Sequence, residues 1–444
     1  MLPTQPRLTV IKNSLMKIHH LFTSFPLLLL SACAPTPTAP PPTLINPAHL
    51  AHLYEEIAIG DTLLGAIWIY CEAPDYRLVP DEDEGFTCVD DVARALVFYC
   101  RHYRAAPSPE LLGKIQRLTD FLLYMQADNG YFYNFLLPGN TINTEHINSR
   151  AVPAFWSWRA WWALSEVNLL EAEGLEGWQA HSRQAIAALM ANLEALCPDP
   201  GAISTFDGIV VPRCLAELGA DQTAVIMMSL ANDYRTQPSA SVKEQLLFWG
   251  ELLLHAQQGD AEMPPHYAFL SWQNHWHAWG NSQAYALLYA GRILEHQPFI
   301  AAGLREVRHF YPYYLEQGFI HSFRLEREGD ELQLRGYRQY PQIAYDLRPM
   351  VFAALEAFTI TNDPKYADIA GRLAAWLFGH NPAGQRMYDP ATGRTFDGIS
   401  APEEVNRNSG AESTIEALLV LQAIEAVPAA QAALRQWQER GDAQ

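Results

Sequence analysis

Residues 88–126 read CVDDVARALVFYCRHYRAAPSPELLGKIQRLTDFLLYMQ, and the two halves of this stretch differ in how their charges are arranged. Residues 88–105 are apolar on nearly all sides. Residues 108–126 keep their charges along one stripe, as a helix does when one side faces water. The link between the two parts is short, and short links join antiparallel neighbours. The stretch therefore predicts a helical hairpin made of one inner and one outer helix.

The same alternation recurs along the chain. Apolar spacing, caps, prolines and glycines predict helices over residues 47–71, 88–105, 108–126, 149–172, 176–196, 212–235, 240–257, 275–295, 299–316, 341–361, 363–379 and 408–426. Short and long links alternate, which places every long loop at one end of the molecule. We therefore predict an all-α fold, an (α/α)6 toroid of six helical hairpins with the long loops on one face. The alternative is an open tetratricopeptide-type solenoid, but its repeat signature is absent from the sequence.

The composition describes a globular chain with enough apolar material for a large core. The chain has 444 residues, of which 49% are hydrophobic and 18% charged, and its formal net charge is −19. Nucleic acid is bound through basic surfaces that displace counterions. The acidic balance therefore predicts that nucleic acid is not a partner.

The N-terminal region predicts export and a lipid anchor. From Met16 the chain has a short basic start, an apolar run too short to span a bilayer, and then Leu-Ser-Ala-Cys ending at Cys33. This tetrad resembles a bacterial lipobox, in which cleavage precedes a cysteine that receives lipid. We expect a lipoprotein signal over residues 1–33 with the true start at Met16, a proline-rich tether over 34–46 and the toroid over 47–440. The alternative is an ordinary signal peptide with a chance cysteine.

Five cysteines remain after Cys33, so they cannot all pair with one another. Cys197 and Cys214 flank one predicted loop, and we expect them to form a disulfide if any pair does. No cysteine lies in a CxxC or Cys/His spacing, so we expect neither a thiolate metal site nor a cofactor.

In the predicted topology, the N-termini of the six inner helices converge on the long-loop face. Polar and aromatic residues are concentrated at these helix starts and in the loops that lead to them. The candidates are Asp90, Asp91, Glu145, Arg150, His275, Trp276, His277, Trp279, Asp346, Arg348, Asp397, Asn408 and Glu412.

Each candidate also has a purely structural interpretation. Carboxylates are favoured at helix N-termini, and Thr87 with Asp90 fits a capping box in which Asp replaces Glu. Adjacent helical residues point about 100° apart. If one aspartate caps the helix, the other faces elsewhere, and we expect it to face the central cavity. The histidines and tryptophans would, in the structural interpretation, be satisfied core residues.

A cavity ringed by carboxylates and aromatic rings suits glycosidic bond cleavage. That reaction needs two carboxyl groups with separated pKa values, one protonated and one ionised. The sequence contains no P-loop, no HExxH and no GxSxG motif. Tryptophan surfaces also suit the apolar faces of sugar rings.

Three motifs carry a resemblance to a known superfamily. CVDDVARAL (88–96), FGHNPAGQRMYDPATGRTFDGI (378–399) and NRNSGAEST (406–414) resemble motifs of the six-hairpin glycosidase superfamily, especially of toroid domains associated with bacterial glycosyltransferases. The likeness spans roughly residues 70–427. The layout is more distantly similar to family 9 endoglucanases, although the Asp-Ala-Gly-Asp signature of that family is absent.

The resemblance implies a glycoside hydrolase that acts on an oligo- or polysaccharide. Together with the predicted lipid anchor, we expect this hydrolase at the cell surface, outside the cytoplasm, and as a monomer. With the expected geometry, it implies Glu412 as general acid and Asp91 as the base that activates water. The alternates are Asp90, Glu145 and Asp346. The expected substrate contacts are His275, Trp276, His277, Trp279, Arg150, Arg348, Asp397 and Asn408.

Two other functions stay open at this point. A polysaccharide lyase on the same fold would depend on His277, Tyr345, Arg150 and Arg348, because it needs a base and a cation that neutralises a uronate. A glycan-binding or assembly lipoprotein without turnover would use the carboxylates only as caps and as acceptors for sugar hydroxyls.

Overall fold

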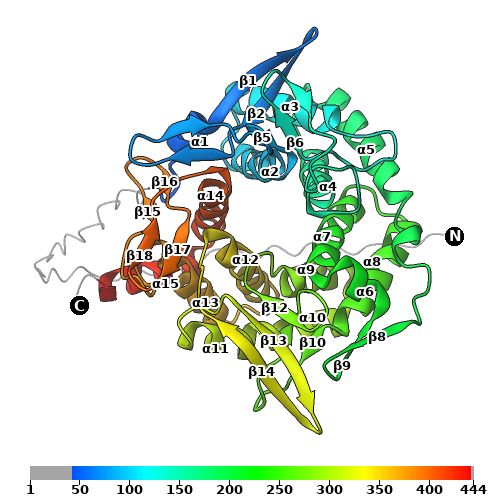
Figure 1. Cartoon of the computed structure of the whole chain (residues 1–444), viewed down its shortest axis with the longest axis vertical. Helices are drawn as coiled ribbons and strands as arrows, with labels where there is room; N and C mark the ends of the chain where they lie inside the picture. Colours follow the sequence, from blue (N-terminus) through cyan, green and yellow to red (C-terminus); the bar gives the residue numbers. More distant parts are fainter. Residues whose placement is uncertain (1–42, 442–444) are drawn as a thin grey trace, which may run out of the picture. The chain divides into compact units, whose positions relative to one another are not determined.

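The computed structural model describes residues 43–441, so the predicted signal, Cys33 and most of the predicted tether lie outside the described residues. The described part forms a compact unit with a continuous hydrophobic core. Six helices form an inner ring (Figure 1). These are α2 (Val89–Ala105), α4 (Phe155–Asn168), α7 (Ala220–Thr236), α9 (Gln283–Leu294), α12 (Ala344–Thr361) and α14 (Ala411–Glu425).

Each inner helix packs against the next in chain order, and α14 packs against α2, which closes the ring. An outer helix follows each inner helix and packs against it. The outer helices are α3 (Pro109–Tyr124), α5 (Glu176–Met190), α8 (Ala240–Leu254), α10 (Gln297–Arg305), α13 (Pro364–Ala374) and α15 (Pro428–Gly441). A π-helical turn, Glu306–Phe310, and α11 (Tyr311–Glu316) extend α10. The predicted all-α (α/α)6 toroid is confirmed.

The links from inner to outer helices are short, and the links from outer to inner helices are long, as predicted. The long loops contain small antiparallel strand pairs and short helices. These are β3 (Tyr70–Glu72), β4 (Arg77–Val79), β5 (Thr87–Cys88), β6 (Phe135–Leu137), β7 (Thr141–Ile142), a 3-10 turn (Glu194–Leu196), β8 (Ile203–Phe206), β9 (Ile209–Pro212), α6 (Arg213–Leu218), β10 (Gln257–Gln258), β11 (Ala268–Phe269), β12 (His275–His277), β13 (Ser322–Glu328), β14 (Glu331–Arg338), a second 3-10 turn (Ala375–Leu377), β15 (Tyr388–Asp389), β16 (Arg394–Thr395), β17 (Gly398–Ala401) and β18 (Glu404–Asn406).

The predicted helix over residues 47–71 is wrong. The segment forms the short helix α1 (Ala48–Leu53) and an antiparallel hairpin of β1 (Tyr54–Ile59) and β2 (Thr62–Ile67). A two-residue turn joins the strands, and Gly60 adopts a φ of 59° there, which favours glycine. The outer helix of the last hairpin is therefore α15, which the sequence analysis did not predict.

A second correction concerns residues 275–295, which were predicted as one helix. The helix α9 begins only at Gln283, and His275–His277 form strand β12, which pairs with β13. The residues of β12 therefore do not stand at a helix N-terminus. The three residues His275, Trp276 and His277 therefore lie elsewhere than the predicted helix start.

The cysteines follow the sequence expectation. Cys197 and Cys214 form a disulfide, which joins the two sides of the loop that carries β8 and β9. Cys71, Cys88 and Cys100 are free and buried.

No single helix among residues 43–441 has the length and hydropathy required to cross a bilayer. The bent pair α14 and α15 meets these criteria only when the two helices are counted together.

Candidate active site

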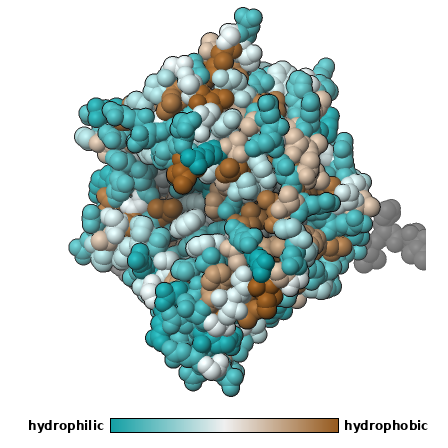
Figure 2. Space-filling view, turned by 45° about the vertical axis from the view of Figure 1, so that its right-hand side comes forward, coloured by the Kyte–Doolittle hydropathy of each residue, from teal (hydrophilic) through white to brown (hydrophobic). Residues whose placement is uncertain are grey.

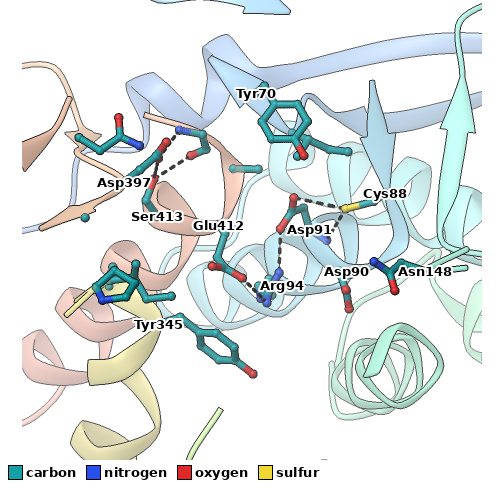
Figure 3. Close-up of a pocket in the computed structure, with 18 of the residues that line it drawn as sticks. Tyr70, Cys88, Asp90, Asp91, Arg94, Asn148, Tyr345, Asp397, Glu412 and Ser413 are labelled. Carbon is teal, nitrogen blue, oxygen red and sulfur yellow. Dashed lines mark hydrogen bonds and ion pairs between the residues drawn. The ribbon is translucent and has the colours of Figure 1, made fainter. Parts of the chain in front are cut away.

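A cavity of about 520 Å³ lies at the long-loop end of the inner ring. The N-terminal residues of α2, α12 and α14 form much of its wall, and the β17 loop and Trp156 of α4 add to it. Figure 2 shows a mostly hydrophilic surface with small hydrophobic groups around a recess. Figure 3 shows the polar side chains that line the cavity. They include Tyr70, Asp90, Asp91, Arg94, Asn148, Tyr345, Asp397 and Glu412.

One arginine connects Asp91 and Glu412, the two carboxyl groups predicted to act as base and acid (Figure 3). Arg94 Nη1 donates to Asp91 Oδ1 at 2.8 Å, and Arg94 Nη2 donates to Glu412 Oε2 at 2.7 Å. Arg94 Nε lies 3.0 Å from Glu416 Oε1, a fully buried carboxylate on the next turn of α14. Arg348 Nε binds the other oxygen of Glu416. Asp91 and Glu412 are thus brought together from the first and last inner helices.

A second arginine holds Asp90. Arg159 Nη1 donates to Asp90 Oδ1 at 2.6 Å, and Arg159 Nη2 donates to the hydroxyl of Tyr345 at 2.8 Å. The guanidinium carbons of Arg94, Arg159 and Arg348 lie 4.9, 5.2 and 5.3 Å from the centre of the Tyr345 ring. Arginines favour aromatic faces, so these contacts fix Tyr345 at the cavity wall.

The charges of this network do not balance. Four carboxyl groups, those of Asp90, Asp91, Glu412 and Glu416, meet three guanidinium groups, so one negative charge is in excess. Burial raises the pKa of Asp91 to about 6, even though Arg94 acts in the opposite direction. The Asp91 side chain is 5% exposed, whereas that of Glu412 is 42% exposed. The two carboxyl groups therefore sit in different environments.

Asp397 lines the cavity and also fixes the start of α14. Its Oδ1 accepts hydrogen bonds from the backbone N–H of Gly410 at 2.9 Å and from the hydroxyl of Ser413 at 2.7 Å. Burial raises the pKa of Asp397. Because Glu412 lies between these two donors in the sequence, Asp397 sets the position from which Glu412 extends.

Asp346 and Arg348 are buried beneath the cavity and are absent from its lining residues. Asp346 Oδ2 accepts a hydrogen bond from the backbone N–H of Ile343 at 3.0 Å, which is the capping contact of α12. Burial raises the pKa of Asp346 well above its usual range. The structure therefore gives Asp346 a capping contact and places Arg348 behind Glu416.

Glu145 and Arg150 lie exposed on the loop before α4 and do not line the cavity. Asn148, between them, does line it. Asn408 Oδ1 accepts a hydrogen bond from the backbone N–H of Ala73 at 3.0 Å, so its amide joins two loops.

The aromatic segment of β12 lies outside the lining of the cavity. His275 is exposed, and Trp276 is buried and stacks on Phe323 with ring centres 5.1 Å apart. His277 Nε2 lies 3.1 Å from Asp221 Oδ2, and its ring stacks on Trp279 at 3.5 Å. The structure does not bring these four predicted contacts together with the carboxyl pair.

Sequence reasoning missed Arg94, Arg159 and Glu416. Each lies inside an apolar inner helix, where a charged residue is costly unless it is paired. A charged residue within an apolar helical run is therefore the sequence signal that could have identified them.

Among the described residues, no group of three or more His, Cys, Asp and Glu side chains is arranged to hold a metal ion.

Comparisons with known proteins bear on the fold. No family model matches the chain, and no curated protein matches it. Its structure is similar to a sugar epimerase from a ruminal bacterium (TM-score 0.58, 12% identity, 85% of this chain and 95% of that one). It is also similar to cellobiose 2-epimerase from Bacillus thermoamylovorans (TM-score 0.57, 11% identity, 85% and 95%).

A family 76 glycoside hydrolase from a bovine Bacteroides thetaiotaomicron strain is similar as well (TM-score 0.52, 11% identity, 87% of this chain and 79% of that one). At these identities the likeness concerns the fold. The solved structures therefore agree with the (α/α)6 fold that the resemblance to the six-hairpin glycosidase superfamily implied.

Proposed function

We propose that this protein is a glycoside hydrolase that cleaves an oligo- or polysaccharide in the long-loop cavity. The observation that carries the proposal is the carboxyl pair Asp91 and Glu412, which both line the cavity and share Arg94. Glycosidic cleavage needs one protonated and one ionised carboxyl group. The unequal burial of this pair supports such a division.

Their environments favour the reverse of the roles first expected. Asp91, with a pKa raised to about 6, is suited to give a proton to the leaving oxygen. Glu412 is more exposed and forms an ion pair with Arg94 at the cavity. In our proposal Glu412 activates water or attacks the sugar, and Asp91 is the general acid.

Three rival functions have less support. A sugar epimerase moves a proton on carbon, most often with histidine, and the cavity is lined by no histidine among the described residues. A lyase needs a cation free to neutralise a uronate, but Arg94 and Arg159 are already bound to carboxylates. A binding protein without turnover would not need a buried cavity carboxyl group with a raised pKa, such as that of Asp91.

The test uses residues 43–444 and a panel of neutral and uronic-acid glycans. New reducing ends without ultraviolet absorbance would indicate hydrolysis, and both signals together would indicate a lyase. Interconversion of a free sugar would indicate an epimerase. In the hydrolysis case, Asp91→Asn and Glu412→Gln should each lower turnover by at least about a hundredfold. Full activity in both variants would refute the assignment.

We further propose that the protein is an extracytoplasmic lipoprotein, anchored through Cys33 to the cell membrane or outer membrane. The support is the lipobox-like tetrad followed by a proline-rich segment. A Cys33→Ser protein should lose lipid labelling and leave the membrane fraction. Unchanged labelling would remove this proposal and leave the hydrolase proposal intact.

A further inference from the structure

A second cavity, of about 640 Å³, lies at the other end of the inner ring. Its wall is built from the C-terminal parts of all six inner helices. It has no part in the proposed hydrolysis, which takes place at the N-terminal ends of the same helices.

Four arginines line this cavity, although the whole chain carries a net charge of −19. Arg101 and Arg104 share the single carboxylate of Glu166. Arg235 Nη1 donates to the uncharged hydroxyl of Tyr289 at 2.8 Å. The remaining arginine, Arg292, is paired with Glu356.

The lining therefore contains four guanidinium groups against three carboxylates, the third being that of Glu425. Glu425 is occupied from within the chain, because Thr43 Oγ1 and the backbone N–H of Leu44 donate to its Oε2 at 3.0 and 3.2 Å. The lining thus has one more guanidinium group than carboxylate. Arg104 shares Glu166 with Arg101, and Arg235 donates to an uncharged hydroxyl, so these two exposed arginines are placed to meet an anionic ligand.

The start of the described chain lies on this cavity. Thr43 and Ile45 belong to its lining. Only nine residues, 34–42, separate Thr43 from Cys33. The ten residue steps from Cys33 to Thr43 would cover about 31 Å at the polyproline II rise of about 3.1 Å per residue. If Cys33 carries lipid, the arginine-lined end must therefore lie close to the bilayer.

We propose that the arginine-lined cavity is a membrane-docking site that binds the phosphate of anionic phospholipid headgroups. Docking there would hold the carboxylate cavity on the side away from the membrane, open to glycans. The proposal rests on lipidation of Cys33 for its orientation, but not on the hydrolase function. Its alternative is that the arginines only stabilise helix C-termini, where cations are favoured.

The experiment measures sedimentation of residues 43–444, which hold the complete helical ring and its core, with lipid vesicles. One vesicle is phosphatidylcholine alone, and the other is an equal mixture of phosphatidylcholine and phosphatidylglycerol. We expect binding to the mixed vesicle only, weakened by salt. Arg104→Gln and Arg235→Gln should each weaken it about fivefold, since one cation near an anionic surface contributes about that factor.

These variants are chosen because neither leaves a buried carboxylate without a cation: Glu166 keeps Arg101. The matched control is Arg213→Gln, an exposed arginine of α6 in a long loop. Unchanged vesicle binding with a lowered melting temperature would support the helix-stabilising alternative and overturn the proposal. Equal weakening by Arg213→Gln, or equal binding to both vesicles, would also overturn it. So would binding of inorganic phosphate without any vesicle binding, which would indicate a small soluble anion as the ligand.

Discussion

The two ends of the helical ring follow the same electrostatic rule and yet differ in what they can do. Carboxyl groups outnumber arginines near the N-termini of the inner helices, and arginines outnumber carboxyl groups near the C-termini, as the helix dipole favours at each end. The sign of the charge alone therefore does not identify an active site. The distinguishing feature is that the loop-end cavity is lined by a carboxyl group, that of Asp91, which is buried with a raised pKa.

The sharpest test of this difference is the loss of one arginine at each end. Arg94→Gln leaves the buried Asp91 without its cation and should lower the free energy of unfolding by about 3–5 kcal/mol. Arg104→Gln leaves Glu166 paired with Arg101, and its side chain is 37% exposed. The Arg104→Gln substitution should therefore lower the free energy of unfolding by less than about 1 kcal/mol. Urea unfolding of both variants measures this, and equal losses would contradict the comparison.

The positioning role of Glu416 can be compared with Glu166, since each is one carboxylate between two arginines. Glu416→Gln should lower kcat by about tenfold to a hundredfold with KM nearly unchanged, because Arg94 loses its fixed orientation. Glu166→Gln should destabilise the fold and leave kcat unaltered. If kcat falls by a similar factor in both variants, Glu416 has a structural role and does not position Arg94 for catalysis.

The pH dependence of hydrolysis should identify the acid. If Asp91 is active in its protonated form, kcat/KM should fall about tenfold for each pH unit above its pKa of about 6. The direction follows because higher pH removes the proton that the acid must donate. Asp91→Asn should retain only residual activity and lose this basic limb. A limb that persists in the variant would assign the titration to another group.

The smallest effect should come from a cap at the short-link end. Ser239 Oγ accepts the backbone N–H of Val242 at the start of α8, at 3.2 Å. Ser239→Ala should cost about 1 kcal/mol of stability without changing kcat. Ser239→Asn, which keeps a capping oxygen, is the control and should behave as the natural protein does in thermal unfolding. A change in kcat for Ser239→Ala would show that the two ends are not independent.

The ring of hairpins could be predicted because it depends on local signals. Helix periodicity and the length of a link can both be recognised within a window of about forty residues, such as residues 88–126. The expectation failed at residues 47–71, where the Gly60 turn makes a hairpin of strands. Part of the reason is tertiary: Gly65 lies against α3, where an added Cβ would stand 3.1 Å from the backbone nitrogen of Leu118. No local pattern shows that contact.

The site could be predicted only in outline. Convergence of helix N-termini brought Asp91 and Glu412 to the same cavity, as expected. The charged surroundings of these two carboxyl groups depend on Arg94 and Glu416. The ion pair between Arg94 and Glu416 joins α2 to α14 where the ring closes. Burial of each carboxyl group is likewise a property of the assembled ring. The raised pKa of Asp91 was for that reason beyond the sequence, and the proposed acid and base roles are the reverse of those first expected.

Closure of the ring by α14 against α2 also has a temporal consequence. Arg94 and Glu412 are 318 residues apart, so the carboxyl pair is completed only after nearly the whole toroid has been synthesised. Contacts of such long sequence separation form late and slowly, because the intervening chain must be ordered first. An emerging polypeptide with five hairpins would already hold Asp91 but lack its partner. The proposed catalyst would thus be assembled by its last hairpin, and a chain whose ring is not yet closed would leave glycans unchanged.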